Sequence, residues 1–66
     1  MDPLFPQVEV ELSDQDGNAF SIIGRTVKAM RRAGVPEEDR QAYVAEATSG
    51  DYDHVLQTTI RTVTTS

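Results

Sequence analysis

The chain has 66 residues, of which 38% are hydrophobic, with no cysteine and one histidine. This length is close to the lower limit at which a single core holds a fold unaided, and the composition excludes disulfides and a structural zinc site as reinforcement. Self-association is the remaining means of stabilisation, so we expect a homo-oligomer, either a dimer or a tetramer.

The acidic residues outnumber the basic ones by eleven to six, which gives a net charge of -5 at pH 7. This balance argues against general, sequence-independent binding to DNA or RNA. No apolar run approaches the roughly 20 residues of a membrane span, and the opening MDPLFPQ has neither the basic nor the apolar segment of a signal peptide. We therefore expect a cytoplasmic protein without a membrane partner.

The first elements expected along the chain are an arm and a strand. Residues 1–7 carry two prolines and predict an extended N-terminal arm, followed by a single domain over residues 8–66. From Val8 to Ser13 apolar and polar residues alternate, which is the period of a half-buried strand with one acidic face.

Residues 16–34, DGNAFSIIGRTVKAMRRAG, predict an amphipathic helix. Its start can be capped by Asp16 or Asn18, and Gly34 suits the left-handed residue that ends a helix. The glycine in its interior, Gly24, lowers helix propensity by about 1 kcal/mol relative to alanine, which indicates close packing at that point. At helical spacing, the core stripe is expected to consist of Phe20, Ile23, Val27 and Met30, widened by Ala19, Ile22, Thr26 and Ala33.

Two further helices and a strand complete the predicted fold. The second helix should begin at Pro36 and end near Gly50, with three acids in its first turn. The third, capped by Asp51, should run to about Thr59. Its inner face is expected to consist of Tyr52, Val55, Leu56, Thr59 and Ile60. The tail is rich in β-branched residues and predicts a short strand over residues 61–65. The expected fold is therefore α+β, a β-α-α-α-β domain with three helices and a two-stranded ribbon.

Two clusters suggest a metal or a catalytic centre and fail on inspection. Asp14, Asp16 and Asn18 have the one, three, five spacing of a calcium loop, but Ala19 and Arg25 stand where the obligatory glycine and the bidentate glutamate belong. The only histidine, His54, lies beside two acids in the first turn of a helix, where capping alone predicts acids. We predict no metal site, no cofactor and no enzymatic activity.

The bases on one side of the first helix, which we call the basic arc, are Arg25, Lys28, Arg31 and Arg32. This arc has two interpretations. The arc is either solvated or paired with acids of the next helix, namely Glu37, Glu38 and Glu46, or it is an anion site, because guanidinium forks match phosphate oxygens. In the second case the phosphate partners are Arg25, Lys28, Arg31 and Arg32. The residues that could contact a base or a sugar are Asn18, Phe20, Ser49 and Tyr52.

The segments DGNAFSIIGR, KAMRRAGV and EATSGDYDHVL resemble a family of very short proteins of phages, prophages and bacterial genomes, over roughly residues 8–63. That family is similar to the phage anti-CBASS sponges, which bind the cyclic dinucleotide signals of bacterial immunity without hydrolysing them. The resemblance implies an oligomer in the host cytoplasm, with cyclic dinucleotide pockets where subunits meet.

Three functions follow from these observations. The first is a non-enzymatic sponge that sequesters cyclic dinucleotide immune signals and so counters anti-phage defence. The alternative is a small acidic protein-interaction module or inhibitor that docks on a host or phage protein. The third is a DNA-associated regulator that uses the basic helix, which the net charge disfavours.

Overall fold

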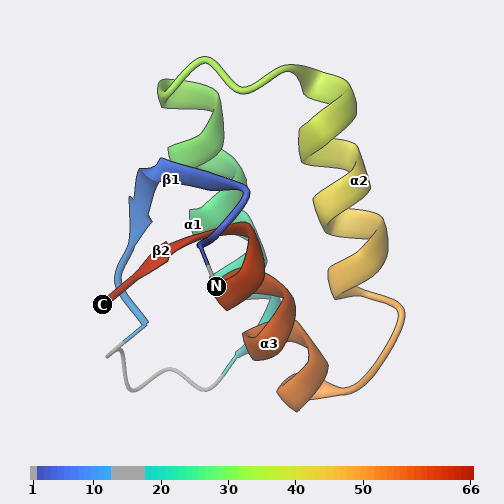
Figure 1. The fold of residues 1–66 in the computed structure, drawn as a ribbon. Helices are drawn as coiled ribbons and strands as arrows, with labels where there is room; N and C mark the ends of the chain where they lie inside the picture. The colour runs from blue at the N-terminus through green and yellow to red at the C-terminus, as the bar shows by residue number, and fades with distance from the viewer. Residues whose placement is uncertain (1, 13–17) are drawn as a thin grey trace.

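The computed structural model describes residues 2–12 and 18–66 (Figure 1). One strand, three helices and a second strand follow one another, so the predicted α+β element order is confirmed. In chain order the elements are β1 (Phe5–Val10), α1 (Ala19–Arg32), α2 (Glu37–Ala47), α3 (Tyr52–Thr62) and β2 (Val63–Thr65).

The two strands pair as expected, but they run parallel, so the predicted ribbon is wrong. The three helices between the strands form a crossover connection, which is what a parallel pair requires. The pairing joins Phe5 to Val63 and Val10 to Thr65, with an irregularity inside β1. It begins earlier than the sequence indicated, because Leu4 N donates a hydrogen bond to Arg61 O (3.0 Å). Strand β1 thus starts inside the stretch expected to be an arm.

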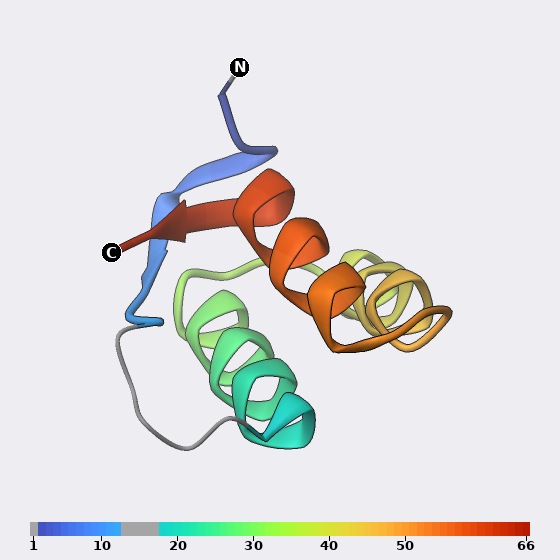
Figure 2. The same ribbon diagram turned by 90° about the horizontal axis from the view of Figure 1, so that it is seen from below.

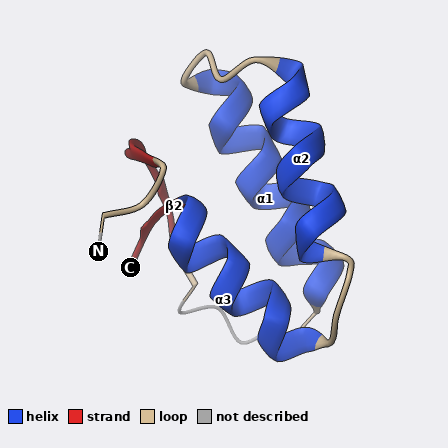
Figure 3. Ribbon diagram, turned by 45° about the vertical axis from the view of Figure 1, so that its right-hand side comes forward, coloured by secondary structure: helices blue, strands red, loops and turns tan. Residues whose placement is uncertain are grey.

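The helices form a layer against this strand pair. Figures 1 and 2 show α1 and α3 next to the strands and α2 farther away, and Figure 3 shows α1 and α2 lying side by side. No helix in the described part of the chain is both long and apolar enough to cross a membrane. The apolar core consists of Val8, Val10, Ile22, Ile23, Met30, Val35, Tyr43, Ala47, Val55 and Val63.

Helix α1 buries part of the predicted face. Its buried residues are Ile22, Ile23, Thr26 and Met30, all of which belong to the predicted stripe. Phe20, however, is 79% exposed and Ala33 is exposed too, so the buried face is centred nearer Thr26 than predicted. The Thr26 hydroxyl donates to Ile22 O (2.8 Å), which satisfies the polar group inside the helix.

Helix α3 is longer than predicted, and its buried face is centred on different residues. It continues to Thr62 and buries three threonines, Thr58, Thr59 and Thr62, beside Val55. The predicted inner residues Tyr52 and Ile60 are 41% and 45% exposed. Threonines can take these places because the hydroxyls of Thr59 and Thr62 each donate to the carbonyl four residues earlier, at 2.8 and 2.7 Å.

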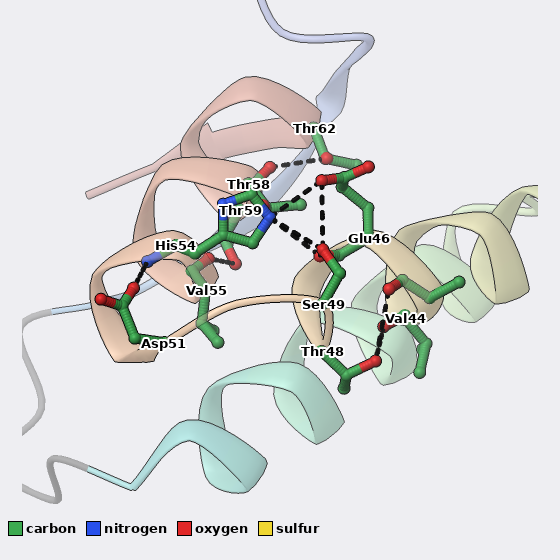
Figure 4. A network of polar contacts seen from close by, with 11 residues as sticks. Val44, Glu46, Thr48, Ser49, Asp51, His54, Val55, Thr58, Thr59 and Thr62 are labelled. Carbon is green, nitrogen blue, oxygen red and sulfur yellow. Dashed lines mark hydrogen bonds and ion pairs between the residues drawn. The ribbon is translucent and has the colours of Figure 1, made fainter.

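The turn between α2 and α3 requires a glycine, and this gives a first test of the fold. A Cβ on Gly50 would lie 2.8 Å from both Cβ and Cγ of His54. The imidazole is held in place, since its Nε2 lies 3.0 Å from Glu46 O (Figure 4). We expect Gly50→Ala to lower the free energy of unfolding by about 1–3 kcal/mol, as overpacking does. Urea denaturation measures this loss.

The control for this test removes the obstructing side chain. In a His54→Gly background the Cβ and the ring that obstruct the added methyl group are both absent, so Gly50→Ala should cost clearly less there than in the wild type. An equal cost in both backgrounds would mean that the turn needs glycine for a reason other than His54.

Candidate functional site

The predicted cations lie on two sides of α1. Three of them, Arg25, Lys28 and Arg32, line a groove of about 550 Å³ between α1 and β1. The acids Glu9 and Glu11 line the same groove. The Arg25 guanidinium donates to Glu11 O (3.1 Å), so it is anchored to the strand end. Two carboxylates therefore offset two of the three cations in this groove.

The fourth predicted cation, Arg31, faces another groove, of about 470 Å³, between α1 and α2. A second guanidinium, that of Arg40, lines this groove from α2. The one carboxylate in the lining, Glu37, accepts a hydrogen bond from Gln41 Nε2 (2.9 Å). The remaining lining residues are apolar: Val27, Val44 and Ala45. We call this the α1–α2 groove.

The guanidinium groups of the α1–α2 groove lack carboxylate partners. Across residues 2–12 and 18–66, neither Arg31 nor Arg40 takes part in an ion pair or a side-chain hydrogen bond. The first of the two interpretations of the basic arc was a solvated face or pairing with acids of α2, and for Arg31 it is the pairing that the described residues do not show. Instead, Glu37 bonds to Gln41 and the Glu46 carboxylate bonds to His54, so those acids are engaged elsewhere.

The weaker site predictions fall at the other end of α1. Phe20 and Tyr52 together line an apolar pocket of about 200 Å³, with Ile23 and Val55 among its walls. The structure therefore brings these two aromatic residues together. It separates them from Arg31, because Arg31 lies eleven helical steps after Phe20, which is about 16 Å along α1.

The two remaining predicted contacts have structural partners. The Asn18 side chain accepts from Phe20 N (2.9 Å), which caps α1. The Ser49 hydroxyl donates to Glu46 O (2.7 Å) at the end of α2. Both polar groups stabilise helix ends, and neither lies in the lining of the α1–α2 groove.

The sequence prediction missed Arg40. Arg40 directly follows Glu37, Glu38 and Asp39 in the sequence. A base beside three acids at the start of a helix suggests a solvated surface residue. Only the packing of α2 against α1 reveals that it faces Arg31 across a groove. The single available signal was that Arg40 is the one base in α2.

The histidine cluster lacks the arrangement of a catalytic triad. His54 Nε2 is 2.8 Å from Glu46 Oε2 and 3.2 Å from Ser49 Oγ (Figure 4). A triad places the acid and the nucleophile on opposite ring nitrogens, whereas here one nitrogen faces both. The Asp51 carboxylate accepts from His54 N (3.0 Å), which confirms the predicted cap of α3. This cluster closes the α2–α3 turn.

The described residues contain no group of three or more histidines, cysteines or acids placed to hold a metal ion. Asp14 and Asp16, on which the calcium-loop spacing depends, lie outside the described residues. Comparisons with family models, curated proteins and solved structures find no match to this chain. The functional proposal therefore depends on the geometry of the grooves and on the resemblance given by the sequence motifs.

Proposed function

We propose that this protein is a non-enzymatic sponge that binds and sequesters a cyclic dinucleotide in the host cytoplasm, and so counters anti-phage defence. The supporting observation is the α1–α2 groove, where Arg31 and Arg40 approach from two helices and have no carboxylate partner among the described residues. The motifs that resemble the anti-CBASS sponges support the same ligand class.

The chemistry of the groove suits this ligand. A cyclic dinucleotide carries two phosphates and two flat bases, and each guanidinium can donate two parallel hydrogen bonds to phosphate oxygens. The apolar wall formed by Val27, Val44 and Ala45 can receive the face of a base. Lys28 and Arg32, in the neighbouring groove, add positive potential that attracts an anion to α1.

Sequestration requires affinity alone. A sponge needs tight binding and enough copies, so no nucleophile or general base has to lie near the phosphates. The one histidine is occupied at the α2–α3 turn, with its Nε2 between Glu46 and Ser49. We therefore expect the ligand to be released intact.

A second class, a protein-interaction module, is favoured by a different observation. Leu4 and Phe20 are 75% and 79% exposed, so two large apolar side chains are available on the surface for contact with another protein. Such a module would leave the α1–α2 groove without a small-molecule ligand, so a binding experiment separates the two functions.

Titration calorimetry with cyclic di-GMP, cyclic di-AMP and cyclic GMP–AMP tests the proposal. We expect at least one of them to bind at micromolar concentration or tighter, and the linear dinucleotide to bind more weakly because it loses more conformational freedom. Chromatography of the released ligand should show it intact. Absence of binding across the panel would refute the sponge and favour the interaction module.

A further inference from the structure

Within one copy of the chain, no described contact requires a glycine at position 24. Gly24 lies exposed near the middle of α1, and among residues 2–12 and 18–66 a Cβ added to it would meet no atom within 4 Å. Glycine in a helix interior costs about 1 kcal/mol relative to alanine. The close packing that the sequence predicted at Gly24 is therefore absent inside the protomer, and a neighbouring chain is the remaining source of it.

The residues next to Gly24 on the helix surface form a continuous stripe. At about 100° per residue, Phe20, Gly24, Val27 and Arg31 fall within about 60° of one another. Phe20 projects from this stripe with 79% of its surface exposed. Val27 and Arg31 form one wall of the α1–α2 groove. One stripe thus carries a projecting aromatic ring, a flat glycine and a groove wall.

We infer that α1 packs antiparallel against α1 of a second copy, around a two-fold axis beside Gly24. Along the helix, Phe20 lies about 6 Å before Gly24, and Val27 and Arg31 lie about 4.5 and 10.5 Å after it. The antiparallel arrangement therefore sets Phe20 of each copy between Val27 and Arg31 of the other. Such an interface is self-complementary, as a two-fold axis requires.

The charges favour this partner and this direction. The basic residues Arg31 and Arg32 lie in the last turn of α1, while Asp51 lines the pocket beside Phe20 at its start. An antiparallel pair brings the basic end of each helix toward Asp51 of the other copy and also opposes the two helix dipoles. A parallel pair would place the arginines of both copies side by side.

The interface would also complete the ligand site, a step that rests on the proposed function. Of the residues that the structure describes, none that lines the α1–α2 groove is aromatic. Phe20 of the second copy would supply a flat wall for a base, directly beside the Arg31 guanidinium. Two identical composite sites would form in each dimer, each with cations from one copy and an aromatic ring from the other.

The oligomeric state tests the interface without any ligand. Because the space around Gly24 is open, Gly24→Leu should fold normally yet block the approach of a second α1. We expect light scattering to give a dimer, or a multiple of it, for the wild type and a monomer for Gly24→Leu. Gln57→Leu, an exposed site on α3, should retain the wild-type mass. A monomeric wild type, or an unchanged mass for Gly24→Leu, would overturn the inference.

Mixing two defective variants tests the composite site. Phe20→Ala lacks the ring and Arg40→Glu reverses a groove charge, so neither should bind the cyclic dinucleotide alone. At concentrations where both dimerise, mixed dimers contain one intact site, and the mixture should recover binding up to half of the wild-type capacity per mixed dimer. No recovery, with the wild type binding normally, would mean that Phe20 acts within its own copy. A wild type that dimerises but binds no ligand would refute the proposed function and leave the interface standing.

Discussion

Replacing both Arg31 and Arg40 by alanine is expected to weaken cyclic dinucleotide binding by at least about 100-fold. A hydrogen bond to a charged group contributes roughly 1.5–3 kcal/mol, so the two guanidinium groups together supply about 3–6 kcal/mol. Since 1.4 kcal/mol corresponds to a factor of ten in the dissociation constant, the loss lies between about 10² and 10⁴. Titration calorimetry on the ligand that binds the wild type measures it.

Stability should hardly change in the same variant. Neither guanidinium makes an ion pair within the described residues, so alanine removes no internal contact of that kind. Arg61→Ala provides the matched control, because Arg61 is exposed in the last turn of α3. Its hydrogen bond with Leu4 N is made by the backbone carbonyl, so alanine keeps it. The control should bind ligand like the wild type. An equal loss of folding and binding in the double variant would assign Arg31 and Arg40 a structural role.

Binding should also depend on salt, in a way that separates the two grooves. Arg32→Ala removes a cation from the groove between α1 and β1, which we call the β1–α1 groove. There the Arg32 charge contributes only long-range attraction to the ligand. We expect a few-fold loss of affinity at low ionic strength that shrinks at high salt, because exposed charges are screened within about 10 Å at 0.1 M. A loss as large as that of the arginine pair would place the ligand in the β1–α1 groove instead.

Local signals in the sequence were sufficient to predict the elements and their order. Asn18 and Asp51 cap α1 and α3 as predicted, and Gly34 ends the first helix with a φ of 85°. These signals depend on residues within one turn of each other, so the sequence alone contains them. The alternation from Val8 to Val10 likewise identified buried strand positions.

The spacing located the buried faces of α1 and α3 only in part, because their exact centres depend on long-range packing. Phe20 fits an apolar stripe by spacing, yet Thr26 takes the core position since its hydroxyl bonds to the helix backbone. Arg40 was missed for the same reason, because its role appears only when α2 lies against α1. The parallel strand direction also follows from the three-dimensional path of the helices and not from any local motif.

Replacing the buried threonines of α3 by valine is expected to change the free energy of unfolding in opposite directions at adjacent positions, Thr58 and Thr59. Thr59 donates to Val55 O, so its oxygen accepts from the buried Tyr43 hydroxyl at 2.7 Å. Thr59→Val keeps the shape but leaves that hydroxyl without a partner, which costs about 1–3 kcal/mol. A chain of this length has only roughly 3–10 kcal/mol of stability in total, so the loss is severe.

Thr58→Val is expected to raise stability by about 1 kcal/mol, although it makes the same chemical change one residue earlier. Within the described part of the chain the buried Thr58 hydroxyl has no hydrogen-bond partner, so valine removes a desolvated polar group at no cost in packing. Urea midpoints at one protein concentration measure both variants, because the stability of an oligomer depends on concentration. Adding Tyr43→Phe to Thr59→Val should recover most of the loss, since both partners are then apolar. If Thr58→Val and Thr59→Val shifted the urea midpoint in the same direction, the Tyr43–Thr59 hydrogen bond would not stabilise the core.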